Sequence, residues 1–282
     1  MIWRLVFAAL VAAYCLLIVP FTVYLKDRPV VVKLGYSPHP QLLRAASGEH
    51  RPTVAALEVL RVLFYYGTTL QKAQEQVIVP PEYFNMYKAL QGAVHLDPYN
   101  MDAYYFAQAA FTWELGRVAE VNHLLEIGMS KRTWDPSLPF YLGFNYAYFF
   151  KDYKKAACYM QRAAELSGNP LYAQLAARYF YESEQTVLGL AFLETMIQSS
   201  RDKAVRKAYE IRREALQAVQ SLEAAVADYR LRFGTLPPTL AALVKAKILS
   251  KIPVDPYGGT FFLDAGGKVR TTSRFAVPVA EP

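Results

Sequence analysis

Residues 134–170 constrain the fold of this chain more than any other stretch. Large and small side chains alternate at helical spacing on both sides of a turn at residues 151–153. Such alternation lets two helices approach closely and interlock. The stretch therefore predicts two short helices folded back on each other, and the residues that carry the pattern are Leu142, Gly143, Tyr146, Ala156, Met160, Ala163 and Ala164.

A proline recurs at the end of each predicted hairpin. Pro98, Pro136 and Pro170 each follow an Asp or Asn, and they lie 38 and then 34 residues apart. This spacing, with the order of large and small residues, resembles the tetratricopeptide repeat (TPR), whose period is about 34 residues. The resemblance covers roughly residues 53–200 and implies a TPR-like α-solenoid of three to four helical hairpins, a binding scaffold. Helical hairpins unrelated to that family are the alternative.

The remaining helices are predicted from periodicity and from helix-stopping prolines. A helix over residues 53–77 places Leu57, Leu60, Phe64 and Tyr65 on one side, and the next helix spans residues 82–96. Residues 201–233 carry a single apolar stripe, typical of a helix that caps a repeat array. The predicted fold class is mainly α, ordered as a membrane anchor (1–28), a linker (29–51) with a short extended run at 30–32, TPR-like repeats (52–200), a long amphipathic capping helix (201–233) and a small α+β tail (234–282).

The predicted anchor is a run of 21 uncharged residues, 5–25, about the length that crosses a bilayer. A cleaved signal peptide is the alternative, but no small-x-small cleavage site follows the run. A lipoprotein signal fits poorly, because Tyr14 precedes Cys15 where a small residue is needed. We therefore expect a single-pass transmembrane helix in a bacterial inner membrane. Flanking charges are nearly balanced, and the large C-terminal body favours the periplasm.

The end of the chain has a motif order of its own. Tyr229 is followed by Gly-x-Leu-Pro, Leu-x-x-Leu and Ile-Pro-x-Asp-Pro-Tyr-Gly, and then by two predicted strands at residues 260–263 and 268–272. This order resembles the C-terminal region of type II secretion major pseudopilins over residues 229–273. The resemblance implies a small α+β appendage and a link to secretion or pilus biogenesis. Only Glu281 is acidic after Ser273, so the family's calcium site is not expected.

The sequence contains no recognisable catalytic or cofactor motif. The four histidines are isolated, and no Cys-x-x-Cys, phosphate-binding loop or nucleophile motif occurs. Gly258-Gly259 and Gly266-Gly267 open no helix, so we expect turns there. The net charge of +7 is scattered along the chain, so nucleic-acid binding is not predicted. We expect a protein that is not an enzyme and that has no cofactor or metal.

The repeat resemblance implies that the first helix of each pair lines an inner groove. Aromatic side chains with little charge would dominate this face and suit a peptide with apolar side chains. Alternatively, several of them are buried, since a one-residue shift in register exchanges the faces. The hypothesis is a membrane-anchored scaffold or adaptor for a partner protein or peptide, and the alternative is a structural subunit of a membrane complex without a binding groove. The candidate partner-binding residues are Asp102, Tyr105, Trp113, Phe140, Phe144, Tyr148 and Tyr181.

Overall fold

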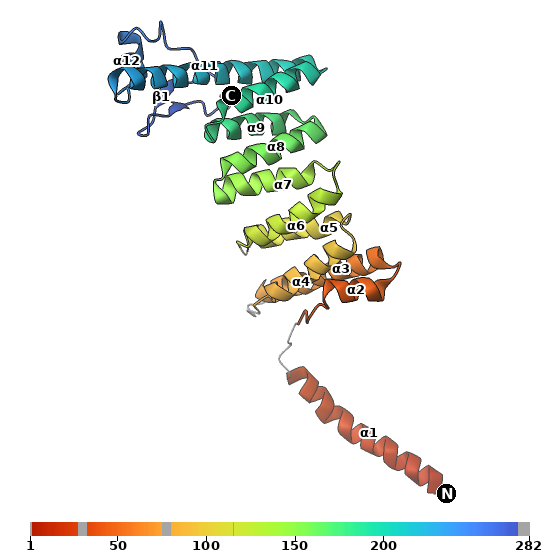
Figure 1. Cartoon of the computed structure of the whole chain (residues 1–282). Helices are drawn as coiled ribbons and strands as arrows, with labels where there is room; N and C mark the ends of the chain where they lie inside the picture. Colours follow the sequence, from red (N-terminus) through yellow and green to blue (C-terminus); the bar gives the residue numbers. More distant parts are fainter. Residues whose placement is uncertain (1, 28–32, 75–79, 115, 276–282) are drawn as a thin grey trace.

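A computed structural model describes residues 2–27, 33–74, 80–114 and 116–275 of the chain. The protein is mainly helical, as predicted, with one two-stranded sheet in this part of the chain. Antiparallel helical pairs stack one above the other (Figure 1). The pairs are α3 (Arg51–Gln74) with α4 (Tyr83–Leu96), α5 (Met101–Phe106) and η1 (Ala107–Phe111) with α6 (Val118–Lys131), α7 (Ser137–Asn145) and η2 (Tyr146–Phe150) with α8 (Tyr153–Ser167), and α9 (Pro170–Glu182) with α10 (Thr186–Ser199).

Short polar residues and glycines set the ends of the helices. The Asn169 side chain accepts a hydrogen bond from the backbone N–H of Leu171, and Pro170 occupies the first turn of α9. Asp152 caps α8 in the same way, and Gly168 ends that helix in the left-handed conformation. These are ordinary N-cap, first-turn and C-cap preferences, which is why the hairpin boundaries were predictable.

Glycines allow the helices of a pair to pack closely. A Cβ atom added at Gly128 would lie 2.6 Å from the ring of Tyr104, and one at Gly143 would lie 3.2 Å from the backbone nitrogen of Met160. Tyr104 is fully buried and its hydroxyl donates to the carbonyl of Pro98 at 2.9 Å. The predicted alternation of large and small residues therefore forms the packing seams of the stack.

Two turns of π-helix, η1 and η2, were not predicted. Each follows the first α-helix of a middle pair, and each widens the last turns before the connection to the second helix. A π-turn adds a residue to the helical repeat, so it shifts the faces of the residues beyond it.

The C-terminal residues form a long helix, a short helix and a hairpin. α11 (Lys203–Phe233) lies across α9 and α10, and the tail packs against it through α12 (Leu240–Lys245) and the antiparallel strands β1 (Phe261–Leu263) and β2 (Val269–Thr271). The buried Asp255 accepts hydrogen bonds from the hydroxyls of Thr271 and Ser273 and from the N–H of Tyr257. The Asp-Pro-Tyr-Gly motif thus ties the loop before β1 to the end of β2.

The N-terminal part differs from the prediction. α2 (Pro40–Ser47) lies within the segment predicted as a linker, and it packs on α4, where the Leu43 side chain lies over Gly92. Helix formation there is consistent with Pro40 at the first helical position. The predicted extended run at residues 30–32 lies outside the described residues.

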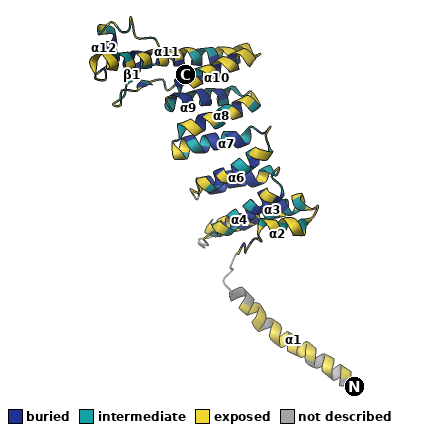
Figure 2. Cartoon of the chain, in the orientation of Figure 1, coloured by how far each residue is buried: buried dark blue, intermediate teal, exposed yellow. Residues whose placement is uncertain are grey.

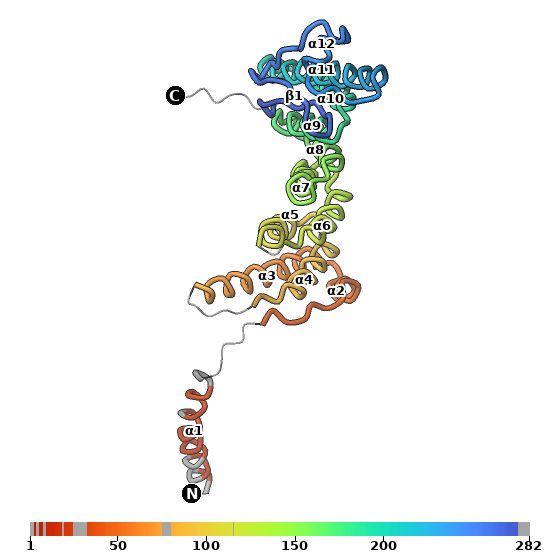
Figure 3. Tube along the Cα trace, turned by 90° about the vertical axis from the view of Figure 1, so that its left-hand side faces the viewer, coloured from red at the N-terminus to blue at the C-terminus, as the bar shows by residue number. Residues whose placement is uncertain are grey.

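α1 (Ile2–Asp27) lies apart from the stacked pairs in both views (Figures 1 and 3). Its described side chains are exposed (Figure 2). Within the described residues, no helix has both the length and the apolar character that a membrane crossing requires. The side chains at residues 1, 2, 4, 5, 8, 9, 19 and 25–28 of the predicted anchor region lie outside the described part.

Candidate partner-binding site

Four aromatic rings meet where two successive first helices end. We call Trp113, Phe144, Tyr148 and Phe149 the aromatic patch. The ring centre of Trp113 lies 5.9 Å from that of Phe144, 5.4 Å from that of Tyr148 and 5.3 Å from that of Phe149. Phe144 and Tyr148 stack nearly parallel at 5.5 Å. These separations are those of favourable aromatic pairs.

The aromatic patch is open to solvent. Trp113 is 54% exposed and Tyr148 is 51% exposed, while Phe144 and Phe149 are partly buried. The ammonium of Lys151 lies 5.1 Å from the ring centre of Tyr148, within cation–π range. The patch is therefore a mainly apolar surface with a positive charge at one edge.

Buried amides support the helices beneath the aromatic patch. Gln108 and Asn145 exchange two hydrogen bonds of 2.9 Å, and Asn145 also donates to Asn122 at 2.8 Å. All three side chains are buried. Because buried polar groups are costly when unpaired, this network specifies one register between the two pairs. Gln108 lies in η1 and Asn145 directly precedes η2, so the network ties the two π-turns together. Tyr148 and Phe149 lie within η2, whereas Phe144 lies on α7 and Trp113 follows η1.

Phe149 was missed by the sequence prediction, and η2 explains the omission. In an α-helix, residue 149 would point away from Phe144 and Tyr148. The i to i+5 pattern of a π-turn brings it back to their side. The one signal in the sequence was the density of aromatic residues at 146–150, Tyr-Ala-Tyr-Phe-Phe, which is too many for a single helix face.

The other predicted groove residues do not join the aromatic patch. Asp102 and Tyr105 are exposed on α5, and Phe140 stacks on Tyr172 at 4.8 Å. Tyr181 corrects the prediction, because its ring is buried and its hydroxyl donates to the carbonyl of Val269 in β2 at 2.8 Å. The tail covers the face of α9 on which a groove residue would have to lie.

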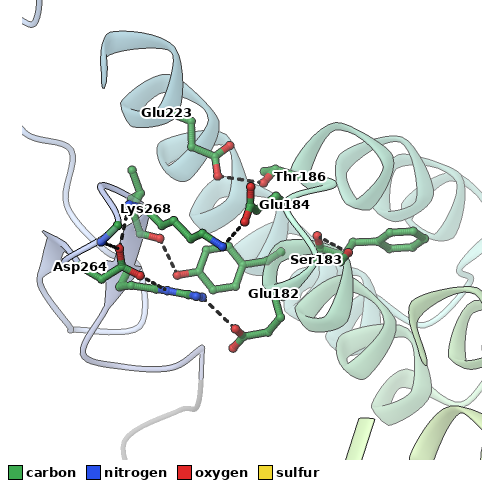
Figure 4. Close-up of polar contacts among 12 residues, drawn as sticks. Glu182, Ser183, Glu184, Thr186, Glu223, Asp264 and Lys268 are labelled. Carbon is green, nitrogen blue, oxygen red and sulfur yellow. Dashed lines mark hydrogen bonds and ion pairs between the residues drawn. The ribbon is translucent and has the colours of Figure 1, made fainter. Parts of the chain in front are cut away.

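A second hollow lies between α11 and the β1–β2 turn, with a volume of about 860 Å³. Apolar side chains of Val226, Leu231 and Leu236 form part of its wall, and Glu223 and Lys268 reach its polar side. Figure 4 shows how charged side chains from the α9–α10 turn meet the hairpin there. Lys268 pairs with Glu184, and the Thr186 hydroxyl donates to Glu223 at 3.3 Å.

Most of these charges hold the tail against α9. Arg270 of β2 pairs with Glu182 of α9 at 2.8 Å and with Asp264 of the β1–β2 turn at 3.3 Å, so its guanidinium links the hairpin to α9 (Figure 4). Burial raises the pKa of the Glu223 carboxyl, an effect that its hydrogen bond from Thr186 opposes. These paired charges join the tail to α9.

Across the described residues, no group of three or more His, Cys, Asp or Glu side chains is placed to hold a metal ion. Comparison of the chain with protein-family models, with curated proteins and with solved structures finds no match.

Proposed function

We propose that this chain is a membrane-anchored, TPR-like scaffold that binds a partner protein or peptide through the aromatic patch. The observation that carries the proposal is the convergence of four rings from two helical pairs on one solvent-exposed surface, with Trp113 at its centre. Exposed Trp and Tyr side chains on a rigid support are the usual anchors of protein interfaces. Tyr148 and Phe149 lie within the π-turn η2, which favours the same view because such turns are frequent at functional sites.

The chemistry of the aromatic patch indicates the kind of segment it binds. Its rings suit an apolar side chain of an extended or helical peptide. Lys151 at the edge of the patch favours an acidic residue beside that apolar anchor, since exposed charges steer encounter and orientation more than they add affinity.

The proposed location rests on the sequence and on α1. Residues 5–25 carry no charge, and large apolar side chains such as Phe7, Leu10 and Leu16 are exposed on α1. We place the body in the periplasm beside a bacterial inner membrane. The pseudopilin-like order of residues 229–273 supports work in secretion, pilus biogenesis or envelope assembly.

A pull-down from detergent-solubilised membranes tests the partner site. We expect the full chain to retain at least one protein that is lost from the Trp113→Ala and Tyr148→Ala variants. Trp134→Ala is the matched control, because Trp134 is similarly exposed (59%) but lies outside the aromatic patch. Its ring stacks on that of Tyr99, which precedes α5. Circular dichroism should show the same helix content for all variants, since each side chain lies at the surface.

A partner set that is unchanged by both patch substitutions would contradict binding at the aromatic patch. That result would favour the alternative of a structural subunit whose repeats only brace a membrane complex. A reporter fused after Pro282 tests the compartment separately, and activity of a cytoplasmic reporter would overturn the periplasmic placement.

A further inference from the structure

α3 has two apolar faces, and only one of them is buried. Ala55, Val59 and Val62 pack in the core of the first pairs. On the opposite side Leu57, Leu60 and Phe64 are exposed, Phe64 by 73%. Their spacing of three and four residues places them along one line of the helix. We call Leu57, Leu60 and Phe64 the α3 stripe.

Nothing in the described chain covers the α3 stripe. α2 packs mainly on α4, with Leu43 over Gly92, and contacts α3 less. An end of a repeat array normally carries a polar outer face, because the last repeat has no neighbour to bury its apolar side chains. Contiguous exposed apolar side chains mark an interaction surface.

Charge and position indicate what lies against this surface. Residues 33–74 contain five basic and two acidic residues, a net charge of +3; the basic ones are Lys33, Arg44, Arg51, Arg61 and Lys72. α2, α3 and α4 form the end of the stack nearest α1 (Figures 1 and 3). Only residues 28–39 separate α1 from α2, and such a segment spans at most about 40 Å.

We propose that the α3 stripe rests in the interfacial region of an anionic membrane, with its leucines and Phe64 at the boundary between headgroups and acyl chains and the basic residues at the headgroups. Apolar burial and attraction between basic side chains and anionic lipid act together in such monotopic contacts. The proposal rests on the membrane anchoring of α1. It adds that the first helical pair contacts the bilayer surface, so that the scaffold is held there at α3 as well as at α1.

The alternative cover is a second copy of the chain. Two copies would bring together two surfaces with the same excess of positive charge, which opposes their association. The charge therefore favours lipid over self-association.

Site-directed fluorescence quenching tests the proposal on the full chain. The two exposed thiols, Cys15 and Cys158, are replaced by alanine, and one cysteine at a time is introduced by Leu10→Cys, Leu60→Cys or Lys207→Cys for an environment-sensitive label. The protein is reconstituted into phosphatidylcholine vesicles that contain phosphatidylglycerol and spin-labelled lipid. We expect the labels at 10 and 60 to lose fluorescence and the label at 207, on the exposed surface of α11, to keep it.

The position of the spin label on the lipid gives the depth. Quenching at 60 should be stronger with a label near the headgroup than with one near the chain end, and it should weaken in vesicles of phosphatidylcholine alone. Quenching at 10 without quenching at 60 overturns this proposal and leaves the anchor standing. Absence of quenching at both positions overturns the anchor as well. A blue shift at 60 without quenching, together with disulfide-linked dimers of the unlabelled Leu60→Cys variant, assigns the stripe to a second copy and also overturns the proposal.

Discussion

The two ends of the helical stack differ in how far their apolar side chains are buried. At the C-terminal end, α11 buries Tyr209, Leu216 and Val219 and turns charged side chains such as Arg206 and Lys207 outward. At the N-terminal end, α3 leaves Leu57, Leu60 and Phe64 exposed. Figure 2 shows the exposed outer surface of α11 above the buried helices beneath it.

This difference shows two ways in which the apolar end of a helical stack can be covered. Another part of the same chain can bury it, or it can stay exposed for a surface outside the chain. α11 and the tail supply a neighbour for the last pair, so the apolar face of α9 and α10 becomes core. At its outer side the first pair receives Leu34, which is buried in the same core, and α2, whose residues are exposed or partly buried. We call the C-terminal end, covered by α11 and the tail, the sealed end, and the N-terminal end, with its exposed α3 stripe, the open end. The sealed end is therefore expected to contribute more to folding stability, and the open end to contact a surface outside the chain.

The same substitution at the two ends gives the largest expected contrast. Leu216→Ala removes a fully buried side chain and should lower the free energy of unfolding by about 2–5 kcal/mol, since it leaves a cavity. Leu60→Ala at the exposed stripe should change it by no more than about 0.5 kcal/mol. Denaturant unfolding of both variants in the same detergent, followed by circular dichroism, measures the two costs. Equal costs would mean that the α3 stripe is part of a core.

The tail contributes to the sealed end through Asp255. Asp255→Ala leaves the hydroxyls of Thr271 and Ser273 and the N–H of Tyr257 without their acceptor. Each unsatisfied buried group costs roughly 1–3 kcal/mol, and we expect the hairpin to exchange its amide hydrogens faster. Asp228→Ala, at an exposed pair with Arg232, is the control and should leave that exchange unchanged. Unaltered exchange in β1 and β2 of the Asp255 variant would show that the motif does not hold the hairpin.

Much of this organisation follows from local sequence. Asn169-Pro170, Asp152 and Gly168 mark helix ends by their own backbone and side-chain chemistry, so the hairpins are predictable without any tertiary contact. Tyr181 is not, because the strand that buries it comes 88 residues later. The direction of the α3 stripe is equally hidden, since Val59 and Leu60 are both apolar and only the placement of α4 decides which one is buried.

The candidate site likewise contains residues that the sequence predicts and one that it does not. Trp113, Phe144 and Tyr148 were expected on one face from the resemblance to the tetratricopeptide repeat, and their rings meet in the structure. The π-turns depend on how one extra residue is accommodated against the buried amides Gln108 and Asn145, and no local periodicity indicates this. The place of Phe149 in the aromatic patch is therefore visible in the structure but could not be predicted from the sequence.

A pH-dependent contrast is expected at the sealed end. Burial raises the pKa of Glu223 above its ordinary value of 4.5, so the folded state favours the protonated carboxyl. Its stabilising contribution is fully present below that ordinary value and is lost as pH rises through the raised pKa. Glu223→Gln should therefore stabilise the protein relative to wild type at pH 7, and the difference should shrink toward about pH 4.

Unfolding curves of both proteins across this pH range measure the effect. Glu165→Gln, on the exposed surface of α8, supplies the control. A Glu223→Gln difference that stays constant with pH, or that grows on acidification, would contradict the assignment.

The smallest expected effect on folding belongs to Phe64. Phe64→Gln replaces a 73% exposed ring with a polar side chain of good helix propensity, so the free energy of unfolding should stay within about 0.5 kcal/mol of wild type. The same substitution should lower the binding of an apolar-surface dye, because it interrupts the α3 stripe at its largest side chain. Phe180→Gln removes a buried ring beneath α11. This substitution should lower the free energy of unfolding and raise dye binding. Loss of stability in the Phe64 variant as large as that in the Phe180 variant would mean that the two ends of the stack are equally closed.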